Sequence, residues 1–349
     1  MKKALATLIP LCIIGFVGFW ISTLVLGAPT FTALGSTSFV DDNSTGGWNK
    51  SYTVKHEELT AEIKANQNLT LDISDVNAVV EPHDEDDIKV YVRNTSGRSV
   101  NVNLERDLNT YTSIKINTGV SFGFGFVNFN IPDFFGFFGG NITDRQVIIK
   151  VPTKTFASMK IAQGSGKSNI SGITALDNSI DLGSGELNFE RNESDYANSF
   201  NINMGSGKGT FTGIQTMNYH INIGSGSCKI SNLTGNGTID IGSGSVDISY
   251  DKSPAGKLDM GSGYAKISVP TDSNTKFRFD IGSGAVEVCT NTQIQKYTKT
   301  GEYTMGEGES SFHIELGSGK IDIGQKGFTP GTVSSQMYSS PISELTITN

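Results

Sequence analysis

A Gly-Ser-Gly triplet recurs through the second half of the chain and constrains the fold more than any other feature. The first seven copies are separated by 18 to 22 residues and the last interval is 35 residues long. A period near 20 residues indicates a stack of similar units, each of which buries its apolar face only against its neighbours. The eight triplets begin at Gly164, Gly183, Gly205, Gly224, Gly242, Gly261, Gly282 and Gly317.

The residues on both sides of each triplet keep the same alternation. Around Gly224, for example, Ile221, Ile223, Cys228 and Ile230 occupy the recurring apolar positions. Period-2 alternation before and after the triplet predicts two strands, each with one buried face. We therefore predict an all-β chain that forms a single-stack parallel β-solenoid, with about 20 residues per coil and Gly-Ser-Gly corners. Glycine is expected at the corners because a residue there needs a positive φ and because stacked corners crowd one another.

The predicted solenoid covers residues 161–324. We interpret the longer last interval as one coil with an inserted loop at about 290–310. An open sheet edge recruits other strands, so both ends of such a stack need cover. We expect residues 59–160 to form an N-terminal β region or cap, and residues 325–349 to form a C-terminal tail or cap.

The first 28 residues predict a membrane anchor. Two lysines follow the initiator methionine, and residues 4–28 are then almost entirely apolar, which is long enough to cross a bilayer. A shorter apolar region is typical of a cleaved signal peptide, and Pro29 disfavours cleavage after the small residues at its end. An uncleaved signal anchor is preferred over a cleaved signal peptide. The lysines place the N-terminus in the cytoplasm, so a polar tether (29–58) and the β domain face outward.

Composition excludes several functions. The formal net charge of −8 disfavours binding to nucleic acid. The cysteines allow at most one disulfide outside the apolar run, between Cys228, which is expected to face inward, and Cys289, which is expected to face outward. The histidines lack metal-ligand spacing, and no catalytic triad or carboxylate pair is apparent. Gly164–Ser168 imitates the end of a phosphate loop, but Ile161 stands where that motif needs glycine. We predict no cofactor, no metal and no enzymatic activity.

One acidic row is a candidate ligand surface. Two residues before three successive corners stand Asp240, Asp259 and Asp280, and alternation places their side chains outside, one above another. Like charges on neighbouring strands repel each other, so this row needs water, lysines or cations. A solvated polar face and a face for a divalent cation or a basic ligand are both open. The acidic stretch Glu81–Asp87 is interpreted as a solvated turn.

A phenylalanine- and glycine-rich insertion at 120–140 departs from the repeat. Its last group, Phe134, Phe135, Phe137 and Phe138, has no strand or helix period. These side chains either pack as part of a cap or contact a partner or lipid, because exposed apolar patches mark interaction sites.

Several stretches resemble one bacterial family. Leu71–Pro82 is similar to its opening strand pair, Ile148–Pro152 to its strand-then-proline entry, and Gly306–Gly308 before the last triplet to its closing repeats. On these residues, about 60–324 of the chain resembles the bacterial putative-adhesin β-strand-repeat domain, found in Lia-type envelope-stress proteins and other surface-anchored proteins. The resemblance is specific for fold and implies a role at the cell envelope.

Two functions follow from the anchor, the repeat and the resemblance. The first is a non-enzymatic, single-pass membrane protein that displays an extracytoplasmic β-solenoid for adhesion or for contact with a protein or another envelope component. The alternative is an envelope-stress sensor or regulator that binds a ligand or a membrane-protein partner through the phenylalanine-rich loop.

Overall fold

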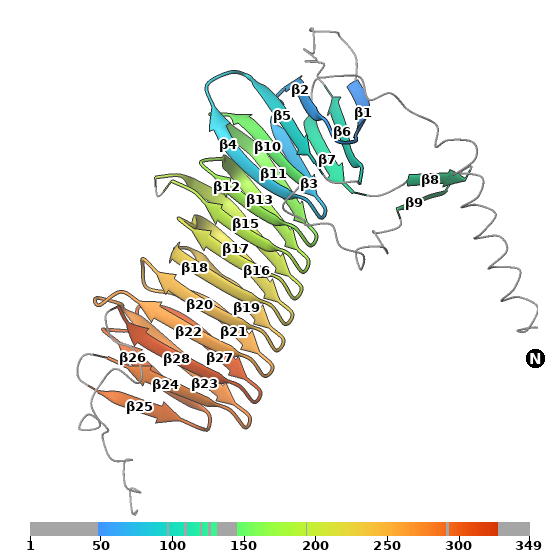
Figure 1. The fold of residues 1–349 in the computed structure, drawn as a ribbon. Helices are drawn as coiled ribbons and strands as arrows, with labels where there is room; N and C mark the ends of the chain where they lie inside the picture. Colours follow the sequence, from blue (N-terminus) through green and yellow to red (C-terminus); the bar gives the residue numbers. More distant parts are fainter. Residues whose placement is uncertain are drawn as a thin grey trace, which may run out of the picture. The chain divides into compact units, whose positions relative to one another are not determined.

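The computed structural model describes residues 48–95, 98–107, 110–118, 121–124, 127–130, 145–192, 194–290 and 293–326. These residues form strands that lie in two 13-stranded sheets, and one separate two-stranded hairpin (Figure 1). The observed fold class is therefore the β-solenoid that the repeat predicts. The predicted membrane helix (1–28) lies outside the described residues. Nothing within the described ranges is a helix with the length and hydrophobicity that a membrane crossing requires.

Sheet A contains the strand that precedes each corner. In spatial order its strands are β1 (Trp48–Val54), β6 (Val100–Asp107), β7 (Tyr111–Asn117), β3 (Asn68–Ile73), β11 (Thr155–Gln163), β13 (Thr174–Leu182), β15 (Tyr196–Met204), β17 (Gln215–Ile223), β19 (Asn236–Ile241), β21 (Ala255–Met260), β27 (Ser310–Leu316), β23 (Thr275–Ile281) and β26 (Gly301–Met305).

Sheet B contains the strand that follows each corner. Its spatial order is β2 (Glu58–Lys64), β5 (Asp87–Asn94), β10 (Arg145–Pro152), β4 (Asn77–His83), β12 (Lys167–Ser171), β14 (Glu186–Glu190), β16 (Lys208–Thr212), β18 (Ser227–Leu233), β20 (Ser245–Tyr250), β22 (Tyr264–Val269), β28 (Lys320–Gln325), β24 (Ala285–Cys289) and β25 (Ile294–Tyr297). The hairpin is β8 (Ser121–Phe124) with β9 (Val127–Asn130).

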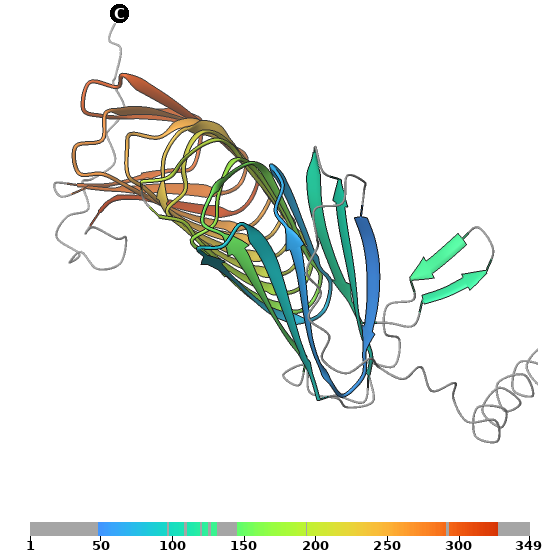
Figure 2. The same cartoon turned by 90° about the horizontal axis from the view of Figure 1, so that it is seen from above.

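The core lies between the inner faces of the two sheets, which form facing layers (Figure 2). Alternate residues of each strand are buried, as the repeat predicts, and each coil lies in register on the next, with Ile202 beside Ile221 and Ile221 beside Ile239. Phe189 and Phe200 meet edge to face across the core, with ring centroids 5.6 Å apart. Full burial of such a side chain contributes roughly 1.5–3 kcal/mol, so the repeated stripe carries the stability of the stack.

The corners show why glycine recurs in them. A Cβ built on Gly185 would lie 2.3 Å from the carbonyl oxygen of Gly166 in the neighbouring coil, and one on Gly226 would lie 2.4 Å from the oxygen of Gly207. The expected crowding is therefore confirmed. The expected positive φ is wrong, because no corner residue has one; the glycines that do are Gly172, Gly213, Gly235, Gly256, Gly306 and Gly308.

The first corner tests this explanation, because it has no glycine. Ser74 and Val76 occupy the places of the two glycines, and the backbone amide of Gly164 donates to the oxygen of Ser74 at 2.7 Å. In the corner stack, each added Cβ would meet the carbonyl of the coil on one side only. Ser74 and Val76 accept the next corner on their carbonyl side, so they can keep their side chains.

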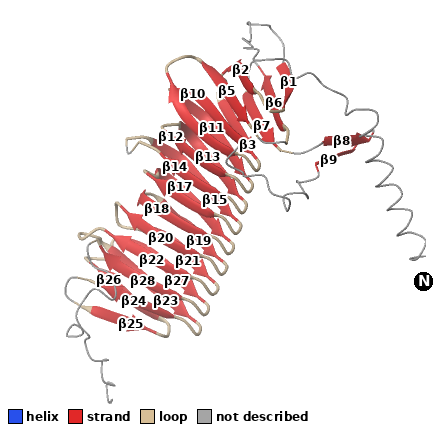
Figure 3. Cartoon of the chain, viewed as in Figure 1, coloured by secondary structure: helices blue, strands red, loops and turns tan. Residues whose placement is uncertain are grey.

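At the C-terminal end, the spatial order differs from the chain order. The last Gly-Ser-Gly coil, β27 and β28, lies between β21–β22 and β23–β24 and pairs in parallel with both (Figure 3). The interpretation of the last interval as a coil with a loop at 290–310 is wrong. This segment instead supplies β25 and β26, which pair antiparallel with β24 and β23 and form the last strand of each sheet.

The N-terminal end is also closed by antiparallel strands. β6 pairs antiparallel with β1 and β7, while β5 pairs antiparallel with β2 and β10. β1 lies within the segment expected to be a polar tether (29–58). Tyr52 and Val54 alternate with polar residues there, and Val54 is buried, which is why this part of the segment is a strand.

Candidate functional site

The acidic row on the outer face of sheet A is present, and it contains one residue more than expected. In the register of the strands, Asp240 lies beside Asp259, Asp259 beside Glu315 and Glu315 beside Asp280. Asp259 and Asp280 are separated by Glu315 because the last coil is inserted between their strands. Sequence order alone could not place Glu315 there, although its position two residues before a corner marked it as outward.

On three of these four strands, a basic residue lies two positions before the acidic one and on the same face. Lys257 Nζ lies 2.9 Å from Glu315 Oε1 and 3.7 Å from Asp259 Oδ2. His313 Nε2 lies 3.0 Å from Asp280 Oδ2 and 3.5 Å from Glu315 Oε1. The hydrogen bond to Glu315 raises the pKa of Lys257. Lys257 therefore offsets part of the repulsion within the row, and a ring nitrogen of His313 lies close to two of its carboxylates.

This pairing favours a polar contact face over a cation site. The described residues include no group of three or more histidine, cysteine or acidic residues arranged to hold a metal ion. The basic residues of this face could have been found from the sequence, because Lys257, Arg278 and His313 all stand four residues before a corner.

A shallow groove of about 850 Å³ runs along the corners on the side of sheet B. One wall is the column of corner serines, and the other is the column of residues that begin the sheet B strands. The corner serines in the groove are Ser165, Ser184, Ser206, Ser225, Ser243 and Ser262, and they face Lys167, Glu186, Lys208, Ser227, Ser245 and Tyr264. A second groove of about 540 Å³ lies on the sheet A side of the first corners only, from Ser74 to Gly205. The corners thus form a polar ridge with a groove along its sheet B side and, at the first corners, a second groove on its sheet A side.

The charges in the corner groove are also paired, with two lysines on one carboxylate. Glu186 lies 3.2 Å from Lys167 and 4.0 Å from Lys208, oxygen to Nζ in each case. At the far end, the hydroxyl of Tyr264 donates to Asp322 at 2.8 Å. Partial burial and this hydrogen bond raise the pKa of Tyr264 to about 12, so the phenol stays protonated. The groove offers hydroxyls, paired charges and one fixed aromatic ring.

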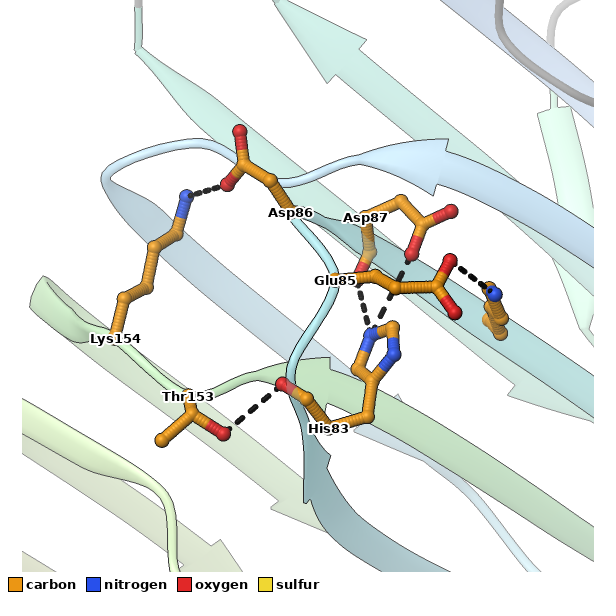
Figure 4. A network of polar contacts seen from close by, with 7 residues as sticks. His83, Glu85, Asp86, Asp87, Thr153 and Lys154 are labelled. Atoms are coloured by element: carbon orange, nitrogen blue, oxygen red, sulfur yellow. Dashed lines mark hydrogen bonds and ion pairs between the residues drawn. The ribbon is translucent and has the colours of Figure 1, made fainter.

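The acidic stretch Glu81–Asp87 is held by ion pairs rather than by water alone (Figure 4). Glu85 pairs with Lys89 at 2.5 Å, and Asp86 pairs with Lys154 at 3.1 Å. The hydrogen bond from Lys89 lowers the pKa of Glu85. The contacts tie the connection between β4 and β5 to the start of the repeat.

The remaining candidates fall into two groups. Phe134, Phe135, Phe137 and Phe138 lie outside the described residues, so contact of this segment with a partner or lipid stays a prediction.

Cys228 and Cys289 are both free and both buried. Burial raises the pKa of each thiol. The outward exposure expected for Cys289 is wrong: it is fully buried at the end of β24, next to the turn into β25.

The fold and its corner ridge define a class of protein, the two-sheet parallel β-solenoid with antiparallel caps. The chain belongs to the Toastrack DUF4097 family, whose model matches residues 66–324. This match confirms the resemblance to a β-strand-repeat family over nearly the same residues. No curated protein matches the chain.

Three solved structures are similar to the chain. A putative lipid binding protein from Parabacteroides distasonis is 14% identical, with a TM-score of 0.35, 79% of this chain covered and 96% of the other. A putative cell adhesion protein from Clostridium sporogenes is 15% identical, with a TM-score of 0.23 and coverage of 80% and 99%. A putative adhesin from Bacteroides fragilis is 11% identical, with a TM-score of 0.31 and coverage of 76% and 97%. At these distances the similarities carry no functional argument.

Proposed function

We propose that the protein is a non-enzymatic, membrane-anchored envelope protein that displays its β-solenoid outside the cell for adhesion or protein contact. The observation that carries this proposal is the corner ridge, which repeats the same exposed polar positions coil after coil on a fixed backbone. A surface of this kind presents many equivalent weak contacts to a partner, and such contacts multiply when they are held together.

The pairing of charges on the outer faces supports a contact surface. Isolated charges in these columns would favour binding of ions, whereas paired charges and serine hydroxyls suit hydrogen-bonded contact with another polar surface. The antiparallel strands at both ends support a displayed unit of fixed length as well. They occupy the sheet edges that would otherwise add strands from other molecules.

The location can be tested by labelling with a membrane-impermeant maleimide in intact cells. The exposed corner residue Ser206 is replaced by cysteine in a chain whose Cys12 is replaced by alanine, because Cys228 and Cys289 are buried. The proposal predicts that Ser206→Cys is labelled in intact cells. The matched variant Lys3→Cys should be labelled only after permeabilisation. The reverse pattern would contradict the proposed topology.

The contact face can be tested by an adhesion assay on cells that carry the chain. Ser206→Arg places a long side chain in the middle of the corner groove, and we expect it to lower adhesion without lowering the melting temperature. Thr271→Arg is the matched control, since Thr271 is exposed at the opposite turn of the coil, between β22 and β23. Equal adhesion by the two variants would contradict the assignment of the groove as the contact face.

A further inference from the structure

The last coil fills a slot between two coils that are consecutive in the chain. The amide of Gly317 donates to the carbonyl of Met260 at 2.8 Å, and the amide of Gly282 donates to the carbonyl of Leu316 at 2.8 Å. Without the last coil, both walls of the slot would have unpaired backbone groups. The slot is therefore a specific receptor for one strand–corner–strand unit, residues 310–325.

The walls of this slot precede its occupant in the chain. β21, β22, β23 and β24 are all complete before β27 and β28 begin. Chains are synthesised from the N-terminus and their parts fold in that order, so the slot is open when the last coil enters it. The last coil of this chain therefore enters the slot after the walls of the slot have formed.

The walls of the slot match the last coil in register, whether that coil belongs to the same chain or to another copy of it. Leu258, Ile314 and Phe279 lie side by side in one inward row, and Gly261, Gly317 and Gly282 stack in one corner row. All the strand pairings of the last coil are with segments that lie earlier in the chain. The short turn from Gly306 to Glu309 is its only covalent connection to the described stack.

This turn has the features of a hinge held by a clamp. Gly306 and Gly308 have φ values of +61° and +74°, which glycine adopts without strain. The side-chain oxygen of Asn274 accepts hydrogen bonds from the amides of Gly308 at 2.5 Å and Glu309 at 3.2 Å. The amide and the hydroxyl of Ser310 donate to the backbone oxygen of Asn274. Asn274 thus directs the chain from β26 back into its own slot.

We propose that the slot also accepts the last coil of a second copy of this chain, which gives a strand-exchanged dimer. Exchange of an identical C-terminal element preserves every strand pairing and changes only the hinge. The partner is specified by the chain itself, because residues 310–325 of a second copy match both walls of the slot in register, charge and corner geometry. Asn274 favours the closed monomer, and its loss favours exchange.

The test uses two full-length chains with one cysteine each, in a background where Cys12, Cys228 and Cys289 are alanine. One chain carries Asp259→Cys and the other carries Glu315→Cys, which lie directly opposite on neighbouring strands. Neighbouring strands are about 4.8 Å apart, which falls in the range that a disulfide spans. The chains are mixed, unfolded and refolded together in detergent, oxidised, and separated on a non-reducing gel. Exchange predicts a covalent heterodimer.

The matched control pairs Asp181→Cys on one chain with Asn203→Cys on the other. These residues also lie opposite each other on the outer face of sheet A, but β13 and β15 are internal to the chain and cannot exchange as a terminal unit. We expect the pair at 259 and 315 to give several-fold more heterodimer than the control pair. Equal yields would overturn the proposal.

A second variant tests the clamp. Asn274→Ala should raise the heterodimer yield of the pair at 259 and 315 several-fold, because it removes two hydrogen bonds that hold the hinge. Asn222→Ala, at an exposed position on β17, should leave the yield unchanged. An unchanged yield with Asn274→Ala would contradict the role of the hinge in exchange.

Discussion

From β11 to β22 each coil lies on the coil that precedes it in the chain, whereas at both ends the spatial order departs from the chain order. The middle is parallel throughout and has a Gly-Ser-Gly corner in every coil. The ends contain antiparallel strands, inserted coils and a first corner without glycine. The comparison shows that the repeat specifies how a coil meets its neighbour, while the ends specify where the stack stops.

The two regions also differ in what their side chains contact. A core residue in the middle packs against coils on both sides, whereas a residue in an edge strand such as β25 has a coil on one side only. The same substitution should therefore have different effects in the two regions. The predictions below use this difference, in order of decreasing effect.

The largest difference is expected for core truncation. Ile230→Ala in β18 should lower the free energy of unfolding by about 4 kcal/mol, because the cavity is enclosed by neighbouring coils. Ile294→Ala in the edge strand β25 should lower it by about 2 kcal/mol, since the site can relax. Denaturant unfolding of both variants measures the difference. Equal losses would show that the edge is packed as tightly as the middle.

The corner explanation predicts an asymmetry between glycine and serine positions. Gly185→Ala should lower the free energy of unfolding by about 3 kcal/mol, because the new methyl group overlaps the carbonyl of Gly166. Ser74→Ala, at the glycine position of the first corner, should change stability by less than about 0.5 kcal/mol. Thermal and denaturant unfolding measure both variants. A small effect of Gly185→Ala would contradict the close approach of the corners.

The middle of the core contains a tyrosine pair that predicts sensitivity to alkali. Tyr219 and Tyr250 are buried with their hydroxyl oxygens 2.9 Å apart. Burial raises the pKa of Tyr219 to about 12, and burial also raises that of Tyr250. Between the ordinary pKa near 10 and the raised one, the unfolded chain binds fewer protons than the folded chain. Stability should therefore be intact below about pH 10 and should fall by roughly 2 to 3 kcal/mol by pH 12 from Tyr219 alone.

Replacing both tyrosines by phenylalanine tests this prediction. The double variant should lose about 1 kcal/mol at neutral pH with the hydrogen bond, but its stability should fall less steeply between pH 10 and 12. Unfolding in denaturant at a series of alkaline pH values gives the slope. An unchanged slope would contradict the raised pKa of Tyr219.

The smallest effect is expected on the outer face of sheet A. Lys257→Ala removes the cation between Asp259 and Glu315, so it should lower the melting temperature slightly at low salt. The difference should vanish near 1 M salt, because salt screens exposed charges over about 3 Å at that concentration. Lys252→Ala, an exposed lysine between β20 and β21, is the control and should have no salt-dependent effect. Identical behaviour of the two variants would contradict the neutralisation of the acidic row.

The sequence predicted the middle of the fold well. Period-2 alternation around each triplet identified the inward residues, including Cys228, and gave the coil length. The reason for glycine was half right, because sequence pattern cannot separate a positive φ from a close backbone approach. Only the three-dimensional structure of the corner shows that the carbonyl of the neighbouring coil excludes a Cβ.

The ends and the candidate site were less predictable. Alternation shows which face a residue lies on, but not which strand lies beside it, so Glu315 could not be placed between Asp259 and Asp280. The antiparallel strands β25 and β26 were hidden within a long interval for the same reason. Pairing of strands that are distant in the chain depends on packing and on edge closure, which a local pattern does not contain.

The order of the coils at the C-terminal end can be measured directly with engineered disulfides in a single chain at high dilution. We predict that oxidation of a chain with Asp259→Cys and Glu315→Cys closes an intrachain disulfide, because these positions lie on neighbouring strands about 4.8 Å apart. The chain with Asp259→Cys and Asp280→Cys should stay reduced, since the inserted coil separates these positions by roughly 9.6 Å. A disulfide in the second chain and none in the first would mean that the coils stack in chain order and that the last coil is not inserted.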